Sequence, residues 1–358
     1  MFFSTFDLGW SRMNLRALAT PHVEHYTLGL YNTLSRLGVE ISLVTLQRRY
    51  AVAARQYMAP RVPVPRGRTL AQHALLALLA RFHDVVHVNS SSEGVAARAY
   101  DKLLVAQHGC PDPNAVEENL SWFYEKEENA LLSLYELGVP IVTISYFSAK
   151  EMRERLGVKV SRVIHHGLLG IFRSEKSRSF KQRHTVLWIS RFTYFKEPFV
   201  LLKAVRELER KLDFILIMRG EGSLKDSIRK YIRSHDLERT VFFQERVPFE
   251  RLPLIYRKAT VYVHTCSREP FGLSVLEAMG SGLPVIVPDS GGAAEVTADA
   301  GLKFRAGDAD DLADKLLAVM QDPELYERLS MKSIERAKAF SWEKAAERYL
   351  ELYKKVGG

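Results

Sequence analysis

A chain of 358 residues is long for one hydrophobic core and sufficient for two domains. Hydrophobic residues make up 47% of the sequence, which excludes a disordered chain, and no apolar run reaches the length of a membrane-spanning helix. The N-terminus lacks the basic and apolar pattern of a signal peptide, and the two cysteines, Cys110 and Cys266, are too few for a disulfide framework. We therefore expect a reduced, cytoplasmic protein.

The formal net charge is +9 at pH 7, and much of the local excess lies in one segment. Between Glu40 and Asp84 there is no acidic residue, while seven arginines occur there: Arg48, Arg49, Arg55, Arg61, Arg66, Arg68 and Arg81. This Arg-rich 48–81 segment is either a solvated surface or a binding site for an anionic membrane surface, a lipid diphosphate or an acidic glycan. No nucleic-acid-binding motif accompanies the charge, so we expect no nucleic acid partner.

The first half of the chain alternates between strand and helix patterns, which is typical of a parallel sheet. The predicted order is a strand at 1–5, a helix at 23–37, a strand at 40–45, an irregular segment at 48–69, a helix at 69–82, strands at 84–89 and 102–109, a helix at 115–137, a strand at 140–145 and a helix at 149–156. The helix at 69–82 is apolar nearly all round, so it is either buried or faces a membrane.

After a charged linker at 169–181, the second half alternates in the same way. Strands are predicted at 186–190, 213–222, 261–264, 285–287 and 300–304, a strand and loop at 240–248, and helices at 224–234, 252–259, 272–279, 307–320 and 340–355, with a further helix starting near Pro198. Asp308 and Asp310 form a D-x-D string at a helix start, where capping explains them better than metal binding.

The stretch from residue 260 to residue 288 carries most of the functional information. It has the pattern strand, loop, helix, strand, and in a parallel sheet the loop and the start of the helix lie at the edge where ligands bind. The N–H groups near Gly272, Leu273 and Ser274 would favour an anion there. Glu269 and Glu277, with seven residues between them, can border the same pocket.

The string EPFGLSVLEAMGSGLPVI, residues 269–286, closely resembles the signature of the retaining glycosyltransferases of family four. In that family the first Glu lies by the donor sugar and the second holds the ribose of the nucleotide. The resemblance implies an α/β GT-B fold, in which two Rossmann-like domains face each other across a cleft and a C-terminal helix crosses back to the first. It places an acceptor-binding domain at 1–170, completed by 341–358, and a nucleotide-sugar donor-binding domain at 171–340.

Other positions match the family's motifs one by one. Arg191 and Lys196 resemble the pair that grips the donor diphosphate, and His108 resembles the family's donor-facing histidine. With Glu269, these three form the implied catalytic set. The implied donor-binding residues are Gly220, Gly222, Val247, Phe271, Gly272, Leu273, Ser274 and Glu277.

The sequence also departs from the family's pattern. The loop at 19–26 lacks the usual glycine pair, His166 stands in place of Asn, and Ser190 and Glu245 stand where glycine is common. These departures leave the acceptor and the nucleotide base open, so that both UDP and GDP donors remain candidates.

The resemblance implies a metal-independent, retaining transferase that moves a hexosyl unit from a UDP- or GDP-linked sugar to a glycan or lipid-linked acceptor. Fixed cations and backbone amides can neutralise a leaving diphosphate without a metal, so we expect no cofactor. The alternatives are a sugar phosphorylase or nucleotide-sugar epimerase of the same fold, and a non-catalytic sugar-nucleotide-binding protein. The expected location is the cytoplasm, peripheral on the inner face of the membrane through the Arg-rich 48–81 segment.

Overall fold

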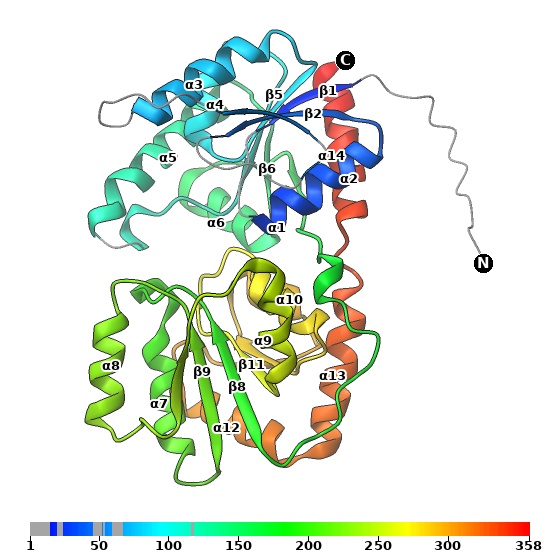
Figure 1. Ribbon diagram of the computed structural model, residues 1–358. Helices are drawn as coiled ribbons and strands as arrows, with labels where there is room; N and C mark the ends of the chain where they lie inside the picture. Colours follow the sequence, from blue (N-terminus) through cyan, green and yellow to red (C-terminus); the bar gives the residue numbers. More distant parts are fainter. Residues whose placement is uncertain (1–14, 20–23, 46–51, 53, 59–66, 116–117) are drawn as a thin grey trace, which may run out of the picture. The chain divides into compact units, whose positions relative to one another are not determined.

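The computed structural model describes residues 15–19, 24–45, 52, 54–58, 67–115 and 118–358 (Figure 1). The strand predicted at 1–5 and four arginines of the Arg-rich segment, Arg48, Arg49, Arg61 and Arg66, lie outside the described residues. The chain forms two compact units, the first made of residues 1–107, 129–142 and 342–358, the second of residues 108–128 and 143–341.

The first sheet has seven strands in the order β3-β2-β1-β4-β5-β6-β7. The strands are β1 (Arg16–Ala19), β2 (Glu40–Thr45), β3 (Arg55–Met58), β4 (Val85–Val88), β5 (Leu103–Gln107), β6 (Ile141–Thr143) and β7 (Arg162–Val163). Strand β1 pairs in parallel with β2 on one side and with β4 on the other. The helices of this half are α1 (Glu24–Tyr26) and α2 (Asn32–Arg36), joined by the π-helical turn Thr27–Tyr31, then α3 (Gly67–Ala80), α4 (Ser91–Ala97), α5 (Glu118–Glu136) and α6 (Tyr146–Leu156).

The C-terminal helix α14 (Trp342–Gly357) belongs to the first unit, as the sequence predicts. It packs against α2, the π-helical turn and β4 (Figure 1). Gly29 allows this packing, because a Cβ atom at that position would lie 2.1 Å from the ring of Trp342.

A buried polar cluster fastens α14 to β4. His87 lies with Nδ1 2.6 Å from the hydroxyl of Tyr353 and with Nε2 3.2 Å from the hydroxyl of Tyr26. The ring of Tyr349 stacks on His87 with a centroid distance of 4.9 Å. All four side chains are fully buried, and burial lowers the pKa of His87 to about 3. The imidazole is therefore neutral at physiological pH.

The second sheet has six parallel strands in the order β10-β9-β8-β11-β12-β13. The strands are β8 (His184–Ile189), β9 (Phe214–Arg219), β10 (Val241–Gln244), β11 (Val261–Val263), β12 (Val285–Pro288) and β13 (Leu302–Phe304). The helices are α7 (Pro198–Leu208), α8 (Lys225–Ser234), α9 (Leu252–Lys258), α10 (Leu273–Gly280), α11 (Gly291–Thr297), α12 (Ala309–Gln321) and α13 (Pro323–Ala337).

Both faces of the second sheet are covered by helices. Val186 and Trp188 of β8 pack into one core with α7, α8 and α12, while Leu187 packs into the other with α9, α10 and α11 (Figure 1). A strand that is buried on both faces is largely apolar, which explains the hydrophobic run from Val186 to Ile189 in β8. The predicted α/β organisation with two parallel sheets is confirmed.

Several elements differ from those predicted, including α4, for which the sequence gives no predicted helix. The interpretation of residues 48–69 as irregular is wrong for Arg55–Met58, because β3 pairs with β2 from Ser42–Arg55 to Thr45–Met58. Strand β1 has the short sequence RALA, whose small residues carry little strand signal even though it is central in the sheet. Helix α13 was not predicted, although it is amphipathic and Asp322 caps its start by accepting from Leu325 N.

The compact units divide the chain at several places, and the predicted domain boundary at residue 170 stays a prediction. Residues 108–128 and 143–170 belong to the second unit. Contacts between the start of α6 and Glu295 explain this assignment. The Glu295 carboxylate accepts hydrogen bonds from the backbone N–H groups of Tyr146 and Phe147 at 3.1 and 2.9 Å. Among the described residues, no helix combines the length and the apolar character needed to cross a membrane.

Candidate active site

The candidate site lies at the carboxyl edge of the second sheet. All six strands run parallel, so the loops that follow β8, β9, β11 and β12 emerge at the same edge. These loops contain Arg191 and Lys196, Gly220 and Gly222, and Glu269 with Gly272. The structure thus gathers at one edge most of the residues that the sequence analysis assigns to the donor.

A charged pair links two of these loops. Lys196 Nζ lies 2.6 Å from Glu269 Oε2, and the two side chains are 11% and 16% exposed. His264 Nε2 lies 3.2 Å from the same oxygen. Burial raises the pKa of Glu269, but the charge of Lys196 and the contact with His264 outweigh it and hold the pKa well below its usual range. Burial lowers the pKa of Lys196, but the charge of Glu269 outweighs it and raises the pKa, so both groups are ionised at neutral pH.

Hydrogen bonds fix the loops on either side of this pair. The hydroxyl of Thr265 donates to the carbonyl of Lys196 at 2.7 Å and accepts from the indole N–H of Trp188 at 3.0 Å. The Glu197 carboxylate accepts from the backbone N–H of Ser267 at 2.9 Å. Glu197 has φ 52° and ψ 47°, a left-handed conformation that is uncommon for a residue other than glycine. Glu197, Thr265 and Trp188 belong to no recognised motif. Their roles depend on contacts that join β8 and the loop after it to the loop that follows β11.

Helix α10 begins at the same edge. Its N-cap is Gly272 with φ 96°, a conformation that favours glycine, and a Cβ atom there would lie 3.2 Å from the Cα atom of Ala293. The first intrahelical hydrogen bond runs from Leu276 N to Gly272 O, so the N–H groups of Leu273 and Ser274 have no acceptor within the helix. These N–H groups and the helix dipole favour an anion at this end of α10.

Glu277 lies on α10 and is 7% exposed. Its Oε2 atom accepts a hydrogen bond from the hydroxyl of Tyr256 at 2.7 Å, and Tyr256 is fully buried. Arg219, at the end of β9, lies near enough for its charge to interact with Glu277, while burial lowers the pKa of the Arg219 guanidinium. The carboxylate of Glu277 is therefore held in one orientation by a side chain that the sequence analysis did not identify.

The other residues predicted to bind the donor differ in their exposure and in their contacts. Arg191 is exposed, and its charge acts on Lys196. A Cβ atom on Gly220 would lie 1.8 Å from Ser190 O, so close packing of two loops already explains that glycine. Val247 is half-buried, and its carbonyl accepts from Arg219 Nη2 at 3.4 Å.

The exposed Gly222 lies beside the backbone of Phe192, where a Cβ atom would be 2.3 Å from the carbonyl oxygen. Phe271 is 2% exposed and packs in the core beneath α10. Its side chain therefore contributes to packing and not to the surface of the site.

His108 lies in the second unit with a histidine partner. Its Nδ1 atom is 3.2 Å from His166 Nε2, and the ring of His166 lies 5.0 Å from the ring of Phe271. His108 is half-buried, whereas His166 is 3% exposed. His166, which stands where the family has Asn, thus supplies a side chain that orients His108. Only the fold reveals this role.

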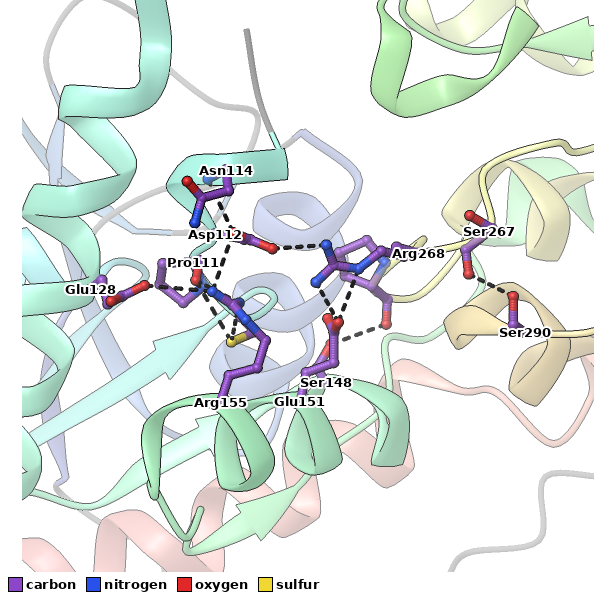
Figure 2. A network of polar contacts seen from close by, with 12 residues as sticks. Pro111, Asp112, Asn114, Glu128, Ser148, Glu151, Arg155, Ser267, Arg268 and Ser290 are labelled. Atoms are coloured by element: carbon purple, nitrogen blue, oxygen red, sulfur yellow. Dashed lines mark hydrogen bonds and ion pairs between the residues drawn. The ribbon is translucent and has the colours of Figure 1, made fainter. Parts of the chain in front are cut away.

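A network of ion pairs holds the loop that carries Glu269 (Figure 2). Arg268 binds Asp112 at 2.7 Å and Glu151 at 2.6 Å. Arg155 also binds Asp112, at 3.2 Å, and lies 3.7 Å from Glu128. Two arginines thus share one carboxylate, which fixes the position of Arg268 immediately before Glu269 in the sequence.

The described residues contain one group with the composition of a metal site. His264, Cys266 and Glu269 offer ligand atoms within 4.8 Å of one another. Burial raises the pKa of Cys266 to about 12. The ammonium of Lys196 already lies against Glu269. The group therefore does not fit a divalent metal, and the other candidate, Asp308, caps α12 as predicted by accepting from Asp310 N and Asp311 N.

Comparison with known proteins identifies the family to which the chain belongs. Residues 23–168 match the family model Glycosyltransferase Family 4, and residues 172–336 match Glycosyl transferases group 1. A D-inositol 3-phosphate glycosyltransferase of Nocardia farcinica is 32% identical over 178 residues, which cover 47% of this chain and 40% of that protein. O-antigen chain mannosyltransferase B of Escherichia coli is 30% identical over 148 residues, 41% of this chain and 39% of that protein. The chain thus matches about two fifths of the length of these curated relatives.

Solved structures share the fold over nearly the whole chain. Sucrose-phosphate synthase from Thermosynechococcus elongatus superposes with a TM-score of 0.80 at 20% identity, covering 96% of this chain and 99% of that one. The Anabaena protein HepE in complex with UDP-glucose gives a TM-score of 0.75 at 16% identity, covering 96% and 100%. With one family model on each half of the sequence and this fold, the chain belongs to the group 1 family of GT-B glycosyltransferases.

Proposed function

We propose that this protein is a metal-independent, retaining glycosyltransferase that moves a hexosyl unit from a UDP- or GDP-linked sugar to a glycan or lipid-linked acceptor. The observation that carries the proposal is the buried Lys196–Glu269 pair beside the N-terminal end of α10. Together they place a fixed cation and a set of backbone N–H groups at the edge of a parallel sheet, which suits a diphosphate.

The proposed chemistry depends on charge that grows on the leaving diphosphate as the sugar becomes oxocarbenium-like. Lys196 remains an ammonium because its pKa is raised, so it can stabilise that charge at neutral pH. Arg191 adds a forked donor set, and the N–H groups of Leu273 and Ser274 add partial positive charge. Fixed cations and amides in these positions do the work of a metal ion, and the leaving phosphate assists attack from the same face of the sugar.

Glu277 and His108 complete the proposed donor site. We assign the Glu277 carboxylate to the ribose hydroxyls, since Tyr256 fixes its orientation through a 2.7 Å hydrogen bond. We assign His108 to the donor sugar, with His166 orienting its ring. The HepE structures with UDP and with UDP-glucose, and the E. coli relative named as a mannosyltransferase, support a nucleotide-sugar donor and leave both bases as candidates.

The function is tested by incubating the protein with a panel of UDP- and GDP-linked hexoses and measuring nucleoside diphosphate release. We expect release with one of the donors, reduced at least about tenfold in Arg191→Ala. Arg239→Ala is the matched control, because Arg239 is equally exposed and precedes β10 at the opposite edge of the sheet. Sugar phosphate formation from phosphate would instead indicate a phosphorylase, and donor binding without turnover would indicate a non-catalytic protein.

Replacing Tyr256 by Phe removes the hydroxyl that holds Glu277. A hydrogen bond to a charged group contributes about 1.5–3 kcal/mol, so we expect the KM for the donor to rise by about tenfold or more with a smaller change in kcat. Steady-state kinetics of the variant measure both constants. Tyr231→Phe on α8 is the control and should leave both unchanged; an unchanged donor KM in Tyr256→Phe would contradict the ribose assignment.

We also propose that the Arg-rich 48–81 segment contacts an anionic membrane surface. At the end of this segment, Leu78 is 59% exposed, and Phe82, which directly follows the exposed Arg81, is 61% exposed. Apolar side chains next to cations suit a lipid interface. We expect salt-sensitive sedimentation with anionic vesicles, weakened several-fold by the double replacement of Leu78 and Phe82 by Ser, while Leu137→Ser, an equally exposed control, has no effect. Equal binding to neutral vesicles would refute the proposal.

A further inference from the structure

A second site for an anion is indicated by a cavity of about 850 Å³ in the second unit. It is bordered by the segment 171–181, the end of α9, Thr260, Ser281 and Tyr326. Thr260 precedes β11 and donates its N–H to Thr185 O at the start of β8. The cavity therefore lies at the amino edge of the second sheet, whereas the candidate active site lies at the carboxyl edge.

The lining of this cavity is strongly basic. Five cations face one carboxylate, that of Glu175; the cations are Arg173, Lys176, Arg178, Lys181 and Arg257. None of the five forms an ion pair with a carboxylate in the described part of the chain, whereas Lys196, Arg155 and Arg268 of the same unit do. Five cations that share one cavity with a single carboxylate repel one another, and an anion that binds among them relieves that repulsion.

Hydrogen bonds fix the wall of the cavity in place. Arg178 donates to the carbonyl groups of Tyr256, Arg257, Ala259 and Ser281 at 2.9–3.1 Å. Its backbone N–H donates to the Ser330 hydroxyl at 2.8 Å. Arg178 is thus a structural anchor that holds the segment 171–181 against α9, α10 and α13, while the other four cations provide charge around the opening.

The size and lining of the cavity define the chemistry of its ligand. The volume lies within the range of pockets that bind small molecules, about 300–1,000 Å³. Besides the cations, Phe180, Pro253 and Tyr326 offer apolar surface. We propose that this basic cavity binds a small phosphate-bearing ligand, separate from the donor site, with the phosphates held by Arg173, Lys176, Lys181 and Arg257.

The proposal is tested with inorganic pyrophosphate as the probe, titrated calorimetrically into the Arg191→Ala/Lys196→Ala variant, in which the candidate active site is disabled. We expect one pyrophosphate to bind per chain, and the dissociation constant to rise at least about tenfold when Lys181→Ser and Arg257→Ser are added. The matched control adds Arg153→Ser and Lys159→Ser, two cations of the basic surface at α6, and should bind as the parent does. These four side chains are exposed, and a circular dichroism spectrum and melting curve confirm that each variant is folded.

Two outcomes would overturn the proposal. One is the absence of pyrophosphate binding to the Arg191→Ala/Lys196→Ala variant, and the other is binding that Lys181→Ser and Arg257→Ser do not weaken. Sedimentation with anionic vesicles, carried out in parallel, distinguishes a lipid headgroup from a free metabolite as the source of the phosphate. Competition between vesicles and pyrophosphate assigns the cavity to a lipid headgroup, whereas pyrophosphate binding without competition assigns it to a free phosphorylated metabolite. Because the parent variant has no functional donor site, failure here leaves the proposed transferase activity untouched.

Discussion

Lys196→Ala is expected to lower kcat/KM for glycosyl transfer by about 100- to 1,000-fold, the usual cost of losing one group that stabilises a developing negative charge. The structure adds a second effect. Removing the ammonium leaves Glu269 as a largely buried carboxylate with His264 as its neighbour, and breaking a buried pair in this way costs up to about 3 kcal/mol of folding stability. Kinetics and thermal unfolding of the same variant separate the two effects.

The double variant Lys196→Ala/Glu269→Gln distinguishes catalysis from folding. Replacing the carboxylate by a neutral amide removes the unpaired charge, so stability should recover while activity stays low. Lys196→Arg is the conservative control. It should retain more activity than either Lys196→Ala or the double variant. Wild-type kcat/KM in Lys196→Ala would contradict the role given to Lys196.

The pH dependence of the pair follows from the two pKa shifts. The lowered pKa of Glu269 stabilises the fold above the ordinary carboxyl value of 4.5, and this contribution is lost as the pH falls. The raised pKa of Lys196 stabilises the fold below the ordinary value of 10.5, and this contribution is lost as the pH rises. The pair therefore contributes fully at neutral pH.

Acid should destabilise the first unit through His87. Its pKa is lowered to about 3 from an ordinary value of 6.5, so below pH 6.5 the unfolded chain binds a proton that the folded chain excludes. The free energy of unfolding is expected to fall by about 1.4 kcal/mol for each pH unit between 6.5 and 3. The affected contacts, with Tyr353 and Tyr26, are those that fasten α14 to β4.

His87→Gln tests this expectation, since glutamine can still form hydrogen bonds but does not titrate. Urea unfolding at pH 5, 6 and 7 should give a flatter dependence of stability on pH in this variant than in the wild type. His235→Gln, at the end of α8 in the second unit, is the control and should follow the wild-type slope. Parallel slopes for wild type and His87→Gln would show that His87 is not the responsible group.

The fold was largely predictable because most strands of both sheets are continuous apolar runs. Strand β12, with the sequence VIVP, illustrates this, and helix α10 follows directly after its N-cap, Gly272. Strand β1 and strand β3 were not predictable, because their sequences RALA and RQYM contain no β-branched residue and pairing with β2 stabilises both. Tertiary pairing, and not local propensity, determines these two strands.

The candidate site was predictable residue by residue but not as an arrangement. Lys196 and Glu269 were identified separately from motifs 73 residues apart, and their ion pair appears only in the fold. The partners that position the site residues, Tyr256, His166 and Arg268, carry no local signal because each acts across a long sequence separation. The motif also does not reveal that the ring of Phe271 packs in the core.

The central claim is that Arg191, Lys196 and the start of α10 bind a nucleoside diphosphate without a divalent metal. Its most direct test is calorimetric titration of UDP and of GDP into the wild-type protein in the presence of EDTA, repeated with Arg191→Ala/Lys196→Ala. The account predicts that one of the two nucleotides binds the wild type in EDTA and that the double variant binds it at least about 100-fold more weakly. Binding that requires added Mn²⁺, or equal binding by the double variant, would contradict it.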